Sequence, residues 1–419
     1  MTERRAAELY IMAVEHLGSD KAQVRSGGLY ALERLAQDNP AQRQTIVNIV
    51  CSYLRRPFSP TAPGSQPEPE VADGQKEPGT ERATGTDGIG ETWERERQVR
   101  LTAQRILTGH LRNDRAKDQW STDSSNARFW TNIRLDLTGA TLIDFYLIDG
   151  AMTDANFRRA TFSGDVSFSG ATFSGNAQFG GAAFSRDASF SGATFSRDAR
   201  FGGAAFTGDA LFGGAAFSGD ASFPEAAFMG DALFGEAAFS RGAGFRRAAF
   251  GGDAEFRKAT FAGDAGFDKA TFSRGAWFDG AVCTGDAWFG EATFGRGASF
   301  ERAVFTGDAW FGEAAFTGDA GFGEATFGGD AWFDKATFSR GASFGEVAFT
   351  GDVWFGQAAV SGDAWFSEAT FSGGAEALHF EQARILSPGA SHVWPTGWRL
   401  VDVDGGGYTV VRADDDGGS

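Results

Sequence analysis

Residues 204–239 read AAFTGDALFGGAAFSGDASFPEAAFMGDALFGEAAF, a string in which Phe returns alternately after five and six residues. The alternation extends in both directions as two 11-residue series, which end at Phe366 and Phe371. Together the series have 40 positions, of which 38 are Phe, and the exceptions are Cys283 and Val360. The residue two places earlier is Ala in 37 cases and Val in three. Such regularity indicates a repeat architecture, although a length of 419 residues would allow several globular domains.

The spacing also predicts the local geometry. A large side chain at every fifth or sixth position, with Ala two places before it, places both residues on one interior side. Alternate inward residues are typical of strands, whereas a helical period of 3.6 cannot keep spacings of five and six on one face. Gly, Ser, Thr and Asp fill the intervals, as in SGDASF and SGATF, and favour tight turns. Each unit is therefore one short strand and one corner.

The strings ATLID (140–144), ATFSG (171–175) and AAFSG (215–219) resemble the consensus of pentapeptide-repeat proteins. The resemblance implies a mainly β fold, a right-handed quadrilateral β-helix with four repeats per coil. Every second unit here carries an extra residue, typically the Asp of SGDA. We therefore expect each coil to combine two five-residue units with two six-residue units, about 22 residues in all. A coil of four five-residue units would be shorter. Some bacterial members also carry a helical N-terminal region, and the start of this chain is similar to it.

We expect five segments along the chain, because open coils expose unpaired backbone edges that flanking residues must cover. Helical spacing of apolar residues marks the start of the chain, and a stretch rich in proline and charged residues follows it. The segments are a small α-helical N-terminal region (1–56), a disordered linker (57–90), a helix with an N-terminal cap (91–134), the β-helix (135–372), and a C-terminal cap with an acidic tail (373–419).

Histidine and cysteine placement argues against chemistry on the repeat. None of the four histidines lies within it, and the chain has no Walker loop, dinucleotide fingerprint or His-Glu-x-x-His string. Cys51 and Cys283 are too few for a four-thiolate zinc site, and Cys283 should be an inert buried thiol. We therefore expect no catalytic, cofactor or metal site. An enzyme in the flanking regions, using His110, His379 or His392, is the alternative.

The first residues, MTERRAAELY, lack the apolar core of a signal peptide, and no apolar run is long enough to span a membrane. We therefore expect a cytoplasmic protein without membrane contact. Positions 1–134 hold 18 acids and 19 bases, so direct nucleic-acid binding is not expected either.

Acidic residues form a second periodic feature. The chain has 55 acids against 38 bases, and residues 135–371 alone hold 30 acids against 16 bases. Asp stands three places before Phe in 14 of 19 six-residue units, which on a 22-residue coil makes two columns on opposite sides. The members singled out as a candidate interaction surface are Asp187, Asp209 and Asp231 in one column and Asp264, Asp286, Asp308 and Asp330 in the other.

Two interpretations of the Asp columns stay open. Some pentapeptide-repeat proteins bind DNA gyrase as mimics of duplex DNA, and the resemblance makes gyrase a candidate partner. The repeat's net charge of -14 over a rod of about 50 Å is one charge per ~3.5 Å, against ~1.7 Å in B-DNA. The other interpretation is structural, with each Asp hydrogen-bonding its own corner.

Tryptophan supplies the third periodic feature. Trp288, Trp310, Trp332 and Trp354 stand 22 positions apart just before a Phe position, and Trp277 and Trp365 fall on the opposite side. Such a strip favours a contact surface for an unknown protein partner or for a second copy in a homodimer. Alternatively the C-terminal segment folds over the strip, or the stacked rings only stabilise the sheet. We expect a non-enzymatic interaction rod, with a gyrase-binding DNA mimic as the alternative.

Overall fold

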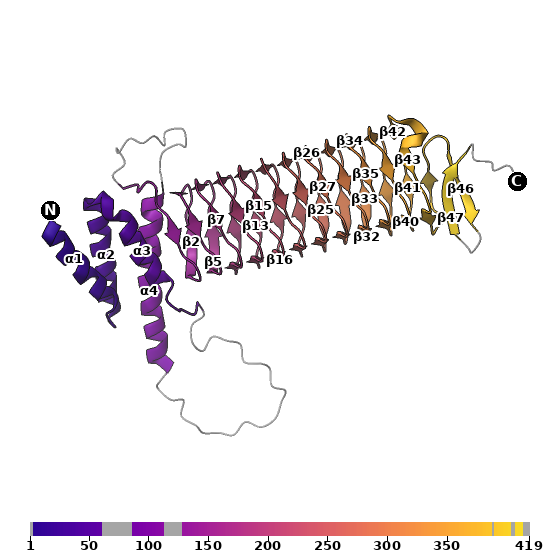
Figure 1. Cartoon of the computed structure of the whole chain (residues 1–419). Coiled ribbons are helices and arrows are strands. Elements are labelled where there is room, and N and C mark those ends of the chain that lie inside the picture. The colour runs from indigo at the N-terminus through magenta and orange to yellow at the C-terminus, as the bar shows by residue number, and fades with distance from the viewer. Residues whose placement is uncertain (1–2, 61–85, 113–127, 388, 404–406, 414–419) are drawn as a thin grey trace, which may run out of the picture.

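The computed structural model describes residues 3–60, 86–112, 128–387, 389–403 and 407–413, and it shows a helical block at one end of a long rod (Figure 1). The helices are α1 (Glu3–Leu17), α2 (Ala22–Asp38), α3 (Arg43–Leu54) and α4 (Thr86–Leu111). Asn39 caps the C-terminal end of α2, and a short 3-10 turn follows at Pro40–Gln42. The predicted linker falls mainly on 61–85, outside the described residues, and α4 begins before the predicted boundary at 91.

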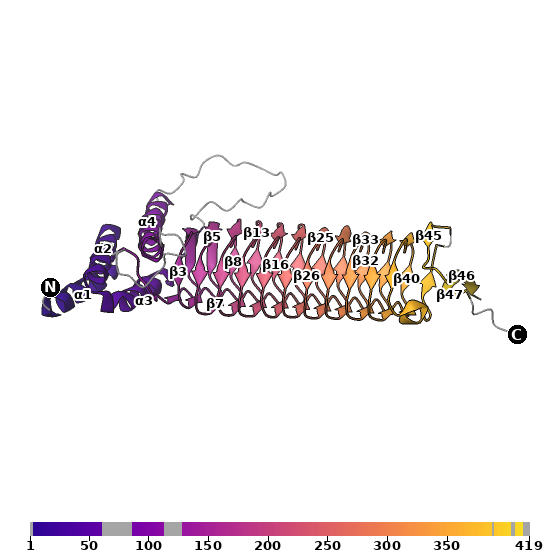
Figure 2. The same cartoon turned by 90° about the horizontal axis from the view of Figure 1, so that it is seen from above.

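The rod is a four-sided solenoid whose chain visits four faces in turn (Figure 2). Face 1 has β1 (Leu135–Asp136) and β4 (Ala155–Asn156), then one strand per coil from β7 (Ala177–Gln178) to β39 (Val353–Trp354), then β43 (Leu378–His379). Face 2 has the first halves of β2 (Thr141–Tyr146) and β5 (Thr161–Ser167), the same repeat from β8 (Ala183–Phe184) to β40 (Ala359–Val360), then β44 (Arg384–Ile385). Face 3 has the second halves of β2 and β5, the repeat from β9 (Ala188–Ser189) to β41 (Ala364–Trp365), then β45 (His392–Val393). Face 4 has β3 (Ala151–Met152) and the repeat from β6 (Thr172–Phe173) to β42 (Thr370–Phe371).

Strand pairing confirms the predicted 22-residue coil. Neighbouring strands are parallel and in register, as in Ala199↔Ala221. The first coil, where the large apolar residues stand strictly five apart, is correspondingly shorter, with Leu135 opposite Ala155. Near the other end the coil lengthens, because a 3-10 turn at Gly374–Ala377 adds residues to a corner and places Leu378 opposite Val353. Strands β43 to β45 continue the solenoid past the predicted boundary at 372, which the longer corner concealed.

The interior consists of stacked Phe columns. Phe201 lies 4.8 Å from Phe223 with nearly parallel rings, and 5.3 Å from Phe190 in the neighbouring column, which it meets edge to face. Both arrangements are favourable for aromatic rings, and each buried ring removes ~150–250 Å² from water. The Ala residues two places earlier are buried beside these rings. Cys283 is also buried, and burial raises its thiol pKa to about 12.

Two glutamine side chains cover the backbone edge of the first coil. The amide of Gln104 in α4 donates to the Ile143 carbonyl (2.6 Å) and accepts from the Ile143 N–H (2.8 Å). Gln44 in α3 makes the same pair of bonds with Arg134, each 2.9 Å long. Each amide thus takes the place that a neighbouring strand would occupy, so these bonds satisfy edge groups that would otherwise template further pairing.

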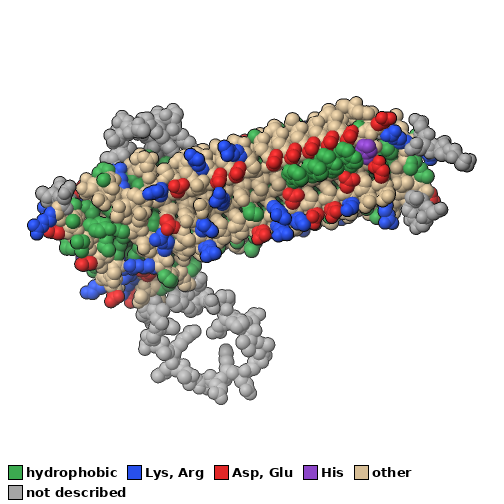
Figure 3. All heavy atoms as spheres, viewed as in Figure 1, with side chains coloured by type: hydrophobic (Ala, Val, Ile, Leu, Met, Phe, Trp, Pro, Cys, Tyr) green, Lys and Arg blue, Asp and Glu red, His purple; other side chains and the backbone are tan. Residues whose placement is uncertain are grey.

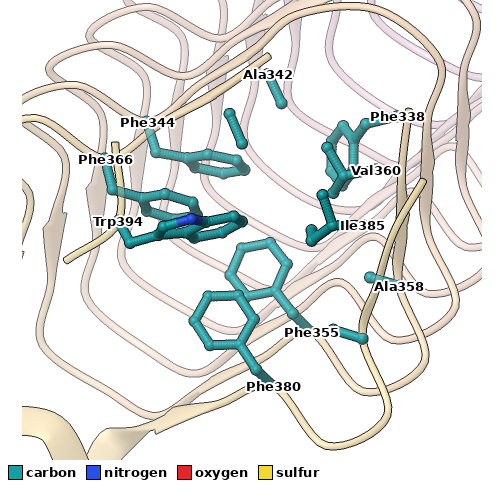
Figure 4. A pocket seen from close by; sticks show the side chains of 12 residues that line it. Phe338, Ala342, Phe344, Phe355, Ala358, Val360, Phe366, Phe380, Ile385 and Trp394 are labelled. Atoms are coloured by element: carbon teal, nitrogen blue, oxygen red, sulfur yellow. The ribbon is translucent and has the colours of Figure 1, made fainter. Parts of the chain in front are cut away.

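Aromatic side chains and a hairpin cover the other end. Trp394 stacks on Phe366 (Figure 4), with ring centres 6.0 Å apart. Trp398 meets Phe380 edge on at 5.2 Å, so the last Phe columns continue into indole rings. Beside them is a small apolar cavity of about 10 Å³ next to Val360. The strands β46 (Trp398–Val403) and β47 (Gly407–Arg412) form an antiparallel hairpin that pairs with β44. The predicted acidic tail lies largely outside the described residues.

Candidate functional site

The four tryptophans predicted to form a ladder stack on face 1, in β27 (Ala287–Trp288), β31 (Ala309–Trp310), β35 (Ala331–Trp332) and β39. Successive ring centres are 5.2, 3.7 and 5.0 Å apart, with planes within 9° of parallel. His379 continues the stack, 5.3 Å from Trp354. The indoles are partly buried rather than fully exposed, because each covers a ring face of its neighbour. Their edges remain at the surface, where Figure 3 shows a hydrophobic strip over these coils.

The C-terminal segment does not cover this strip in the part of the chain that the structure describes. Trp394 and Trp398 contact Phe366 and Phe380 at the end of the rod instead. The rings do stack from coil to coil, which is the geometry that the interpretation of the ladder as a sheet stabiliser requires. The stacking also has a cost, since the indole N–H of Trp310 is buried and has no acceptor among the described residues.

A column of aspartates follows one edge of the ladder, at the corner between faces 4 and 1. In its first four members, the Oδ1 atom of the carboxylate accepts the backbone N–H of the Asp one coil later, at 3.2, 3.1, 3.0 and 2.9 Å. The structural interpretation, in which each Asp hydrogen-bonds its own corner, is therefore wrong about the partner. These carboxylates bond to the next coil instead. Figure 3 shows the row of acidic side chains beside the hydrophobic strip. The column contains Asp264, Asp286, Asp308, Asp330 and Asp352.

We use the name Trp–Asp strip for the four ladder tryptophans together with this Asp column. The described residues provide no ion pair for any of the five aspartates. Across the ladder, the turn carries two ion pairs, Lys269 with Glu291 at 3.0 Å and Lys335 with Glu313 at 3.2 Å. Asp334 in that turn is partly buried, which raises its pKa above the usual value. The strip is therefore acidic along one edge without internal counter-ions.

The remaining predicted residues lie elsewhere on the rod. Asp187, Asp209 and Asp231 form a column at the corner between faces 2 and 3, where the same bond between coils is 2.9 Å long. Trp277 and Trp365 lie on face 3, opposite the ladder, in β25 (Gly275–Trp277) and β41. They do not stack on each other, because three coils without Trp separate them.

Arg257 covers Trp277. Its guanidinium lies 5.1 Å from the indole centre and also pairs with Asp279 at 3.1 Å and Glu255 at 3.4 Å. Sequence periodicity gave no sign of this contact, because Arg257 occupies a turn position where Gly, Ser, Asp and Glu stand in other coils.

The structure does not bring the flanking histidines together. His110 is buried against Trp130 in the helical block, with Glu33 Oε1 2.7 Å from its Nε2. His379 and His392 lie at the other end of the rod, on faces 1 and 3. Within the described ranges, no three His, Cys, Asp or Glu side chains are placed to share a metal ion. No helix in those ranges is both long and apolar enough to span a membrane.

Comparison with known proteins agrees with the coil geometry. The profile of a family described as Pentapeptide repeats (9 copies) matches in overlapping segments from residue 151 to residue 376. The search of curated proteins gave no match, and the search of solved structures gave none either. The matched segments cover more than half of the chain and coincide with its four-sided coils. The chain belongs to the pentapeptide-repeat family.

Proposed function

We propose that this protein is a non-enzymatic interaction rod and that the Trp–Asp strip is where a partner protein docks, in the cytoplasm. One observation carries the proposal: the strip occupies one half of one face, on a backbone whose strands and register are the same in the other half. The fold does not require large apolar side chains at these outward positions, since Arg200, Ser222 and Gly244 occupy them in earlier coils.

Energetics support the same conclusion. The strip leaves a buried indole N–H without an acceptor and stacks like charges without counter-ions, and both features cost stability. Residues whose arrangement lowers stability are expected where a surface is used for binding. Aromatic side chains are also enriched at the centres of protein interfaces.

A photo-cross-linking experiment tests the proposal with a matched control. p-Benzoylphenylalanine replaces Gly312, beside Trp310, or Gly180, the equivalent position six coils earlier. A β carbon at either glycine makes only ordinary contacts, the nearest at 3.8 and 3.6 Å respectively. We expect cross-linked partner in cells from position 312 and little from position 180. Equal yields at the two positions would refute the strip as the docking surface, and a product of two identical chains would identify a homodimer.

DNA mimicry is the second candidate function, and it is supported by the concentration of negative charge in one half of the rod. Residues 263–371 hold 16 acids and 6 bases, a net charge of -10, whereas residues 135–262 hold 14 and 10. At ~4.8 Å per coil the more acidic half carries one net charge per ~2.4 Å, closer to B-DNA than the rod as a whole. A DNA gyrase supercoiling assay at two salt concentrations separates the candidates. Inhibition of supercoiling that weakens at the higher salt concentration would support DNA mimicry. If micromolar protein has no effect on supercoiling, the interaction rod is the function that stands.

A further inference from the structure

The Trp ladder begins abruptly, and its first ring has one uncovered face. Trp288 stacks on Trp310 on one side, while the strand partner on its other side is Gly266. The ladder position before that is Gly244, where a β carbon would meet nothing within 4 Å. At Gly266 the nearest atom to a β carbon would be the Asp268 carboxylate, 3.9 Å away. Among the described residues, no ring or cation contacts this face of Trp288.

Carboxylates flank the open space on both sides. Asp264 and Asp268 stand two residues before and two after Gly266, so strand alternation places all three outward. Asp264 uses Oδ1 to accept the N–H of Asp286, at 3.2 Å. Burial raises the pKa of Asp268, an effect that Glu291 reinforces and that Arg246 and Lys269 oppose. In the described chain neither carboxylate takes part in an ion pair.

Face 3 shows what completes such an arrangement. There Arg257, from the turn one coil before Trp277, lies over the Trp277 ring and pairs with the carboxylates of Glu255 and Asp279. Trp288 lies 11 positions after Trp277, and the residue 11 places after Arg257 is Asp268. The position that supplies the cation on face 3 therefore carries an acid on face 1.

We propose that the open face of Trp288, with Asp264 and Asp268 beside it, binds an arginine side chain from a basic segment of the partner protein. A guanidinium is planar, stacks on indole, and has donors in its plane for carboxylates on either side. Lysine offers only a compact charge without that plane. The inference rests on the proposed function, because it names the chemistry with which a partner would begin its contact with the strip.

The test uses the whole chain and labelled oligo-arginine, oligo-lysine and oligo-citrulline peptides of equal length, with binding followed by anisotropy. Asp268→Arg should place a guanidinium on Trp288, as Arg257 does on Trp277, and Gly266→Trp should extend the ladder over the site. We expect oligo-arginine to bind about tenfold more tightly than oligo-lysine, and each variant to lose about tenfold in affinity. Oligo-citrulline, which keeps the shape without the charge, should not bind.

Two controls separate the site from general charge attraction and from misfolding. Gly321→Trp makes the same substitution on face 3, where the nearest contact of a β carbon is 3.7 Å away. Glu324→Arg makes the same charge change at a turn position where Arg302 stands one coil earlier. Both should bind oligo-arginine like the unaltered chain. Affinities for oligo-arginine that are equal in Asp268→Arg and Glu324→Arg, or in Gly266→Trp and Gly321→Trp, would overturn the arginine site. Cross-linking at position 312, two coils away, would still decide the proposed function separately.

Discussion

The two halves of face 1 have the same backbone and different surfaces. Up to Gly266 the outward residue of each strand is small or polar, and Arg200 pairs with Asp198 at 3.1 Å. From Trp288 onward the same position carries stacked indoles beside unpaired aspartates. The inward Phe column of face 1 continues across this boundary, since Phe267 stacks on Phe289 as Phe201 stacks on Phe223. In this protein the inward residues set the fold, and the outward residues are free to define a binding surface.

The largest expected effect comes from disrupting the Phe core, which both halves of the rod have in common. Phe256 is fully buried between Phe234 and Phe278, 4.9 Å from each. Phe256→Asp places an unpaired charge there and should lower the free energy of unfolding by about 4–5 kcal/mol or more. Urea denaturation measures the loss, and Glu255→Gln, which changes the outward neighbour, is the control. An unchanged midpoint for Phe256→Asp would contradict the inward placement.

The next effect concerns the bonds between coils. Asp308 accepts the Asp330 N–H and donates its own N–H to Asp286. Asp308→Ala leaves the Asp330 N–H without its acceptor and should cost about 1–3 kcal/mol in unfolding free energy. Asp308→Asn keeps a carbonyl oxygen in place and should cost less. If thermal denaturation shows equal losses for both variants, the carboxylate contributes through its charge and not as an acceptor.

Removing one ladder ring distinguishes binding from stability. Trp332 stacks between Trp310 and Trp354, and each aromatic pair contributes about 0.5–1.5 kcal/mol. Trp332→Ser should therefore lower the melting temperature slightly and abolish cross-linking from position 312. The reciprocal substitution Ser222→Trp, in the other half, should change neither the melting temperature nor the cross-linking from position 312. Retained cross-linking in Trp332→Ser would show that the rings serve the sheet alone.

The smallest effect is a dependence on pH. Burial raises the pKa of Asp334 above 3.8, and Glu381 reinforces the shift while His379 opposes it. Ionisation is then less favourable in the folded chain than in the unfolded chain, so it costs stability at neutral pH. That cost disappears as the pH falls through the raised pKa to below 3.8. Asp334→Asn should thus melt slightly higher at neutral pH and match the unaltered chain in acid; a lower neutral melting temperature would exclude the effect.

Periodicity in the sequence predicts those parts of the molecule that repeat. Small residues at the Ala199 position and Phe at the Phe201 position recur in the 22-residue coils, so their burial and the register between coils follow from spacing alone. The Trp–Trp contacts of the ladder also follow from the 22-residue spacing. His379 could not be placed on the ladder in advance, because the longer corner before it shifts the register.

Contacts that occur once carry no periodic signal. The pairing of Gln104 with Ile143 joins two different elements far apart in the chain, and only their folded positions bring them together. The Asp columns are intermediate: their spacing shows that they stack, but whether a carboxylate bonds its own corner or the next coil depends on backbone geometry. The recurrence of Asp at the same corner of successive coils was the available signal for the second arrangement.

Exchanging the ladder between the two halves tests the central claim most directly. The exchange moves Trp to the earlier coils and the earlier residues to the later coils, through Gln178→Trp, Arg200→Trp, Ser222→Trp, Gly244→Trp, Trp288→Gln, Trp310→Arg, Trp332→Ser and Trp354→Gly. The measurement is the cross-linking yield in cells from p-benzoylphenylalanine at position 180 and at position 312. If the outward residues define the docking surface, the partner is lost at 312 and gained at 180. Cross-linking that stays at 312 would contradict the account.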